Sequence, residues 1–132
     1  DYLDSEFEEY NEMAEFFVED DEMLKCLSAG NAGTEEFYKK IQETVLPAIK
    51  LYSCINSGVN SMVIYLDRDI DDRLENLAPI SEIENCEWYD NAINNYIPNW
   101  YIDSAKGKVV MAKSFKNENK NDFLGVIYME ME

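Results

Sequence analysis

Two tryptophans and three tyrosines gather late in the chain, and these side chains have the chemistry best suited to contact with a small molecule. They form the pairs Trp88-Tyr89 and Trp100-Tyr101, with Tyr96 between the pairs. Tryptophan and tyrosine combine a large apolar face with a polar edge, so they suit both hydrophobic cores and pockets that stack on sugar rings. For Trp88 and Trp100, which flank this stretch, a pocket and a core are equally good interpretations.

Catalytic chemistry has little support in the sequence. The chain contains no histidine, which removes the usual general base, the Ser–His and Cys–His nucleophile pairs and histidine-ligated metals. Its 28 acidic residues offer many carboxylate pairs by chance, and no spacing singles out a glycosidase-type pair. No glycine-rich phosphate-binding motif is present. We predict that this chain is not an enzyme and uses no cofactor.

Metal binding has equally little support. The acidic run at residues 67–72 begins like an EF-hand loop, but Asp72 stands where that loop needs glycine and Ala78 where it needs glutamate. The cysteines form no CxxC unit, which argues against a zinc cage. They lie far apart in the sequence, at Cys26, Cys54 and Cys86. We therefore predict no metal site and three buried, unpaired thiols.

The composition indicates a single domain with an acidic surface. Of the 132 residues 46% are hydrophobic, which is enough for one core. The 28 acidic and 11 basic residues give a formal charge of −17, so we expect no nucleic-acid partner. No run of 18 apolar residues marks a membrane span, and the chain begins at Asp1, which we interpret as a piece of a longer protein.

A long amphipathic helix is predicted over residues 2–27. Residues 1–24 hold eleven acids and no base, which marks one strongly solvated side. The other side carries apolar residues at steps of three, four or seven. They are Leu3, Phe7, Tyr10, Ala14, Phe17 and Leu24. Within this stripe, Phe7, Tyr10, Ala14 and Phe17 are also partly suited to self-association, so we expect a parallel homodimer in the full-length protein.

A second helix should follow a breaker cluster at residues 28–33. Thr34 is its expected N-cap, because a hydroxyl there can accept from the first turn and the acids that follow suit the helix dipole. The apolar spacing continues to about residue 56. Pro47 lies inside this pattern and must kink the helix or split it.

Strands are predicted in the second half of the chain. Residues 61–67 contain a continuous apolar run that suits a central strand, and residues 67–85, with Pro79, are loop-like. A short helix is expected from Trp88 to Tyr96. Three strand-like segments with short links, which force antiparallel neighbours, lie at residues 99–104, 108–115 and 123–131. The fold class is therefore α+β, with 123–131 paired to 61–67 because the most apolar runs belong at the centre.

Several short motifs occur in an order that resembles the extracellular sensor domain of YesM-type bacterial sensor histidine kinases, which belong to the Cache (PAS-like) group. The most specific are a helix start, a strand start and a closing strand: Trp88-Tyr89 with Ala92, Pro98-Asn99-Trp100, and Leu124 to Glu132. Each is weak alone, and their order and spacing carry the resemblance. It covers residues 35–131, with the long helix in front.

The resemblance implies a five-stranded antiparallel sheet with the long helix on one face and a ligand pocket on the other. It implies one extracellular sensor domain over residues 1–132, with the helix and turn at 1–33 and the Cache core at 34–132. Its full-length protein would be a two-component histidine kinase with flanking transmembrane helices and a catalytic domain absent from this chain. The alternative is a surface or secreted PAS-like module that responds to a partner protein and binds no small ligand.

One departure from the group bears on the ligand. Relatives that bind amino acids carry an arginine two residues before the tryptophan of the Trp-Tyr pair, to grip the ligand carboxylate. Cys86 stands there in this chain, and Arg68 and Arg73 lie elsewhere. Together with the net charge, this favours a small neutral or cationic ligand such as a sugar. The predicted pocket is walled by Tyr65, Trp88, Tyr89, Trp100 and Met111, unless these side chains fill the cavity themselves.

Overall fold

The structure is a computed structural model that describes residues 2–28, 34–55, 59–70, 74–117, 119 and 121–131. The side chains of residues 2–6, 16, 53–55, 59 and 60 also lie outside the description. The first half is helical and comprises α1 (Tyr2–Glu19), α2 (Asp21–Ser28), α3 (Glu35–Lys40), a π-helical turn η1 (Ile41–Val45) and α4 (Leu46–Ile55). The second half comprises β1 (Val59–Leu66), β2 (Leu77–Pro79), a 3-10 turn η2 (Ile80–Glu82), α5 (Tyr89–Ile93), β3 (Asn99–Asp103), β4 (Lys108–Lys116) and β5 (Phe123–Met131).

The strands form one sheet in the order β2-β1-β5-β4-β3. The predicted pairing of the last strand with the first long strand is confirmed, because β5 runs antiparallel to β1 from Met131 opposite Val59 to Gly125 opposite Leu66. The Asp67 amide extends this ladder by donating to the Leu124 carbonyl at 2.8 Å. The α+β class, the five strands and the packing of the N-terminal helices on one face are likewise confirmed.

The sheet differs from the prediction at one edge. Residues 67–85 were expected to be loop, but Leu77–Pro79 forms β2, which runs parallel to β1, so the sheet is not wholly antiparallel. Asn76 prepares this pairing: its carbonyl accepts from the Ile64 amide at 2.9 Å, and its side chain donates to the Met62 carbonyl at 2.8 Å. Pro79 fits because an edge strand leaves a backbone donor unused.

The predicted long helix is two helices. Its stretch over residues 2–27 breaks at Asp20, where α1 ends and α2 begins. Asp20 ends the first helix by capping the second, since its Oδ1 accepts from the amides of Glu22 at 3.0 Å and Met23 at 3.2 Å. An aspartate that satisfies the first free amides of a new helix stabilises a change of direction at that point.

The second predicted helix starts and bends where the sequence indicates. Thr34 caps α3, with its Oγ1 accepting from the Phe37 amide at 3.2 Å. The turn just before Pro47 is π-helical, over Ile41–Val45. Proline has no amide hydrogen to donate to the preceding turn, and a wider turn relieves the resulting clash. Pro47 therefore distorts this helix without ending it.

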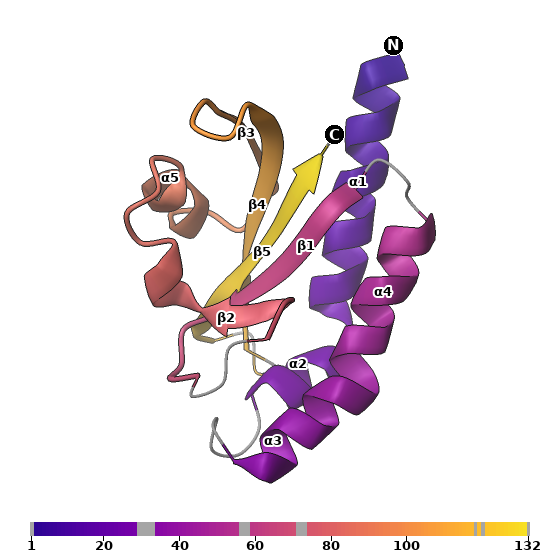
Figure 1. The fold of residues 1–132 in the computed structure, drawn as a ribbon, viewed down its shortest axis with the longest axis vertical. Coiled ribbons are helices and arrows are strands. Elements are labelled where there is room, and N and C mark those ends of the chain that lie inside the picture. Colours follow the sequence, from indigo (N-terminus) through magenta and orange to yellow (C-terminus); the bar gives the residue numbers. More distant parts are fainter. Residues whose placement is uncertain are drawn as a thin grey trace.

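Strand residues alternate between the two faces of the sheet, and the faces carry different cores. One face packs against α1, α2, α3 and α4 around Phe17, Leu24, Met62, Met111 and Met129. The other is covered by the excursion, which we define as residues 80–98 and which contains η2 and the short helix α5. Figure 1 shows α1 and α4 on one side of the sheet, α5 on the other, and both chain ends at the same end of the molecule.

Candidate ligand-binding site

The candidate site lies on the sheet face away from α1, between the excursion and the β3–β4 hairpin. The ring of Trp88 stacks on that of Tyr128, with centroids 5.5 Å apart and planes at 23°. The ring centroid of Tyr101 lies 6.2 Å from that of Trp88, and Tyr65 meets Tyr128 edge-on at 5.9 Å. Trp88, Tyr65 and Tyr128 are buried, so most of this aromatic cluster is a wall rather than an open surface.

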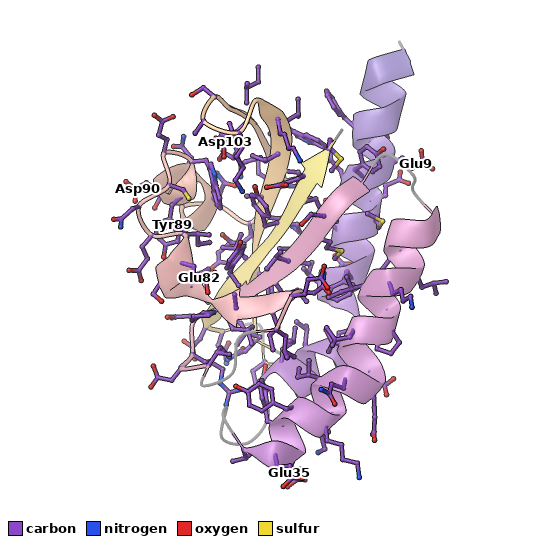
Figure 2. The ribbon with its side chains drawn as sticks, in the orientation of Figure 1. Glu9, Glu35, Glu82, Tyr89, Asp90 and Asp103 are labelled. Atoms are coloured by element: carbon purple, nitrogen blue, oxygen red, sulfur yellow. The ribbon has the colours of Figure 1, made fainter. Side chains whose placement is uncertain are left out.

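A half-open cavity of about 380 Å³ adjoins this cluster. Its volume lies in the range of small-molecule sites. Two stretches of chain line it: Asn85, Cys86, Glu87, Trp88 and Asn91 from the excursion, and Tyr101, Ile102, Asp103, Ser104 and Ala105 from the hairpin. Figure 2 shows labelled Asp103 at the hairpin and Tyr89 and Asp90 on the excursion that faces it.

The lining combines carboxylates, amides and aromatic rings. The charged side chains among the lining residues are Glu87 and Asp103, both acidic. Burial and then the Asp103 carboxylate raise the pKa of the Cys86 thiol, while Lys106 acts the other way. The field of Asp103 thus reaches across the cavity to the opposite wall. The Tyr101 hydroxyl is buried without a hydrogen-bond partner in the described part of the chain.

The hairpin that forms one wall has a fixed shape. Asp103 Oδ1 accepts from the amides of Ala105 at 3.1 Å and Lys106 at 3.2 Å, and its carbonyl accepts from Gly107 at 2.7 Å. Gly107 has φ of +66°, a conformation that glycine adopts without strain. These bonds explain the hairpin signal in the sequence and hold the Asp103 carboxylate at the mouth of the cavity.

An ionic network between exposed lysines and the nearly buried Glu130 carboxylate ties the same hairpin to β5. The Lys106 ammonium donates to Glu130 Oε1 at 2.6 Å, as does the Tyr128 hydroxyl at 2.6 Å, and Lys108 lies 3.7 Å from Glu130 Oε2. Burial alone would raise the pKa of Glu130, but the bonds from Lys106 and Tyr128 bring it below its ordinary value. The bond to Glu130 raises the pKa of Lys106, whereas burial and then Glu130 raise that of Tyr128. Both lysines beside the cavity are therefore engaged with Glu130.

This network predicts a pH-dependent effect of Glu130→Gln. A carboxyl whose pKa is lowered on folding stabilises the protein above its unfolded pKa of about 4.3, and this stabilisation disappears as the pH falls through the lower folded value. At pH 7 we expect Glu130→Gln to cost about 1 to 2 kcal/mol, because two charge-assisted hydrogen bonds are weakened. The difference should shrink steadily as the pH falls below about 4.

Urea unfolding of both proteins across this pH range checks the prediction. The control is Glu36→Gln, which removes an exposed helical pair with Lys40 at 3.8 Å and should change the free energy of unfolding little at any pH. A difference for Glu130→Gln that stays constant from pH 7 to pH 3 would contradict the assignment.

The structure separates the predicted site residues into two groups. Tyr65 and Trp88 belong to the aromatic cluster on the cavity side, and partly buried Tyr89 packs against the same core. Trp100 and Met111 belong to the core on the α1 side. A single pocket walled by all five residues is therefore not what the structure contains, and ligand contact by any of them stays a prediction.

Trp100 has a structural role on the α1 side. Its ring lies 4.3 Å from that of Phe7 and 6.2 Å from that of Tyr10, and its indole donates to Asn11 Oδ1 at 2.8 Å. Met111 stands directly opposite Trp100 in the β3–β4 pairing, so both side chains lie on the same face. It is fully buried. These contacts fix α1 against β3.

The predicted dimer stripe is buried within the monomer. Tyr10, Ala14 and Phe17 are each at most 4% exposed and belong to the core on the α1 side, whereas Phe7 is half-buried against Trp100. The side chain of Leu3 lies outside the described residues. Self-association through these residues would compete with the attachment of α1, and the parallel homodimer of the full-length protein stays a prediction.

The cysteines agree with the prediction only in part. Cys26 and Cys86 are free, as expected, but both are partly exposed rather than buried. The side chain of Cys54 lies outside the described residues. Within the described part of the chain, no three histidine, cysteine, aspartate or glutamate side chains come close enough to hold a metal ion. Asp71, Asp72 and Arg73 lie outside that part.

Several lining residues escaped the sequence interpretation. Tyr101 was noted only as a neighbour of Trp100, yet of these two residues it is Tyr101 that lines the cavity. Asp103 and Asn91 carried no signal beyond a hairpin and a helix. Strand alternation carried a signal for Tyr101: successive strand residues point to opposite faces, so only one member of the Trp100-Tyr101 pair can face the pocket.

No helix in the described ranges is long and apolar enough to cross a membrane.

Comparisons with known proteins place the fold. No family model matches the sequence, and neither does a curated protein. The ligand-binding domain of the Campylobacter jejuni chemoreceptor Tlp3 in complex with L-valine superimposes with a TM-score of 0.55 at 17% identity, over 96% of this chain and 54% of that one. The Tlp3 sensory domain with isoleucine bound gives a TM-score of 0.53 at 16% identity, over 96% and 54%.

The likeness concerns architecture. This chain spans about half the length of the Tlp3 structures that it matches. At 16% to 17% identity the agreement establishes a common fold, and the fold is Cache-like, as the sequence resemblance implied. A fold of this kind hosts many functions, and each depends on the chemistry of its site.

Proposed function

We propose that this chain is the extracellular ligand-binding sensor domain of a membrane receptor, and that the receptor is a two-component histidine kinase. The observation that carries the proposal is the half-open cavity of about 380 Å³ between residues 85–91 and 101–105, beside a stacked aromatic wall. The Cache-like fold supports it, since the matched Tlp3 domain is described as ligand-binding. The two chain ends at one end of the molecule suit attachment to a membrane on that side.

The ligand that we propose is small and neutral or cationic. The cavity lining carries Glu87 and Asp103, and the neighbouring Lys106 and Lys108 are engaged with Glu130. A ligand carboxylate would meet two like charges here and would compete with Glu130 for the lysines. The Tlp3 structures contain L-valine or isoleucine, which makes amino acids the natural competing ligands to test.

A thermal-shift screen tests this function. Ligands that bind the folded state raise its stability by about 2.7 kcal/mol at a concentration one hundred times Kd. We expect a sugar or an amine to raise the melting temperature, and dicarboxylates to leave it unchanged. L-valine and isoleucine are included as competitors. A panel of sugars, amines and amino acids in which no compound raises the melting temperature would contradict the proposal.

The receptor context is tested separately by the gene that encodes this chain. A histidine kinase predicts transmembrane segments on both sides of the domain and a kinase domain downstream. A reading frame that continues into another kind of output domain would leave the sensor role intact and would refute the kinase assignment.

A further inference from the structure

Two consecutive residues of β4 hold the segment that joins the two cavity walls. The Ser114 hydroxyl donates to the Ala92 carbonyl in α5, and the Lys113 ammonium donates to the Tyr96 carbonyl. Consecutive strand residues point to opposite faces, so these two hydrogen bonds hold the segment from opposite faces of the sheet. Residues 92–98 run from α5 to β3, so the Tyr96 carbonyl lies on the segment that joins the two walls.

Lys113 is a buried cation placed between this segment and α1. Its side chain is 7% exposed, and burial lowers the pKa of its ammonium. The carboxylates of Glu15 and Glu19 on α1 act in the opposite direction. A buried ammonium is costly unless it is paired, and Lys113 has the Tyr96 carbonyl as its bonded partner, with Glu19 lining the same cavity.

The surroundings of Lys113 leave room for it to change partner. A second cavity of about 180 Å³ lies between α1, β4 and the joining segment. It is lined by Val18, Glu19, Tyr96, Lys113, Ser114, Phe115 and Lys116. A lysine carries three donors on a flexible stem, so its ammonium can turn within such a space from a carbonyl toward a carboxylate. The Lys116 ammonium lies over the ring of Tyr96, 4.8 Å from its centroid, and restricts the movement of that ring.

We propose that Lys113 is the positioning residue that couples the ligand cavity to helix α1, an inference that rests on the sensor function proposed above. An occupant that separates the cavity walls draws the Tyr96 carbonyl away from Lys113. The ammonium then pairs more closely with Glu15 and Glu19 and holds α1 more tightly against β4. The coupling is a shift between two arrangements of one side chain, each favoured by a different state of the cavity.

Cys86 supplies a way to fill the cavity without knowing the natural ligand. It is a free, partly exposed thiol in the lining. In a Cys26→Ser and Cys54→Ser background, 2-aminoethyl methanethiosulfonate attaches a small amine to Cys86, at alkaline pH because the pKa of this thiol is raised. Amide hydrogen exchange of residues 12–19 is then measured with and without the label. We expect exchange in this part of α1 to slow about fivefold on labelling.

Variants separate coupling through Lys113 from a general effect of the label. The slowing should vanish in Lys113→Met and in the double variant Glu15→Gln with Glu19→Gln, and should persist in Lys113→Arg. The double variant changes only exposed side chains, so it is informative even if Lys113→Met fails to fold. Its matched control is Glu8→Gln with Glu12→Gln, on exposed positions of the same helix, which should respond like the parent.

Two results would overturn the inference. One is equal slowing in the parent and in the Glu15→Gln, Glu19→Gln variant, which would show coupling by another route and leave the sensor function standing. The other is no change in α1 exchange when Cys86 of the parent is labelled. The thermal-shift screen judges the sensor function independently of either result.

Discussion

Replacing Gly125 by alanine should destabilise the domain more than replacing any other glycine of the described chain by alanine. A Cβ at Gly125 would lie 2.1 Å from the Tyr65 carbonyl oxygen and 3.2 Å from Leu66 Cα, and both contacts are with backbone. Gly125 stands in β5 between Leu66 of β1 and Phe115 of β4, at the centre of the sheet. The strands must move apart to admit the methyl group, which we expect to cost about 3 kcal/mol.

The matched control is Gly107→Ala in the hairpin. A Cβ there meets no atom within 4 Å, and the cost comes from its φ of +66° alone. That cost should be about 1 kcal/mol. Urea unfolding followed by circular dichroism measures both variants. Equal losses for Gly125→Ala and Gly107→Ala would mean that β1 and β5 do not approach as closely as the structure has them.

Truncating the two tryptophans should separate ligand binding from stability. Trp88→Ala removes the ring stacked on Tyr128 and opens the cavity wall, so we expect at least about a hundredfold loss of affinity for the best compound of the screen. Trp100→Ala removes the contact with Phe7 and the bond to Asn11, both on the α1 face. It should leave affinity within about threefold while lowering stability by about 3 kcal/mol.

Calorimetric titration of both variants measures the split. Trp88→Phe and Tyr101→Phe are milder companions, in case the alanine variant does not fold: the first keeps an aromatic wall, and the second removes only the buried hydroxyl without a partner. Each should weaken binding by a smaller factor than Trp88→Ala. Loss of binding in Trp100→Ala, with affinity retained in Trp88→Ala, would contradict this account and place the site on the α1 face of the sheet.

The fold could be predicted largely because its signals are local. Thr34 and Pro47 mark a helix start and a distortion by their own backbone chemistry, and the apolar runs at 61–67 and 123–131 belong at the centre of any sheet that they form. β2 was missed for the opposite reason. Its three residues pair in parallel with a distant strand and contain Pro79, so nothing within residues 77–79 signals a strand.

The site was harder to predict because it depends on which face of the sheet α1 covers. Trp100 and Tyr101 are neighbours in the sequence but point to opposite faces, and their roles are assigned only once α1 has docked. The contact that decides this is the bond between the Trp100 indole and Asn11, which are 89 residues apart. Aromatic content alone therefore pointed to the region of the candidate cavity and mixed residues from the two faces of the sheet.

The central claim is that a small molecule binds between the excursion and the β3–β4 hairpin. A chemical-shift perturbation map tests it most directly, with backbone amides of the labelled domain followed by NMR while the best compound of the screen is added. We expect the largest changes at residues 85–91 and 101–105, with smaller ones at 92–98. Changes confined to α1, α3 and α4, or none at saturating concentration, would contradict the claim.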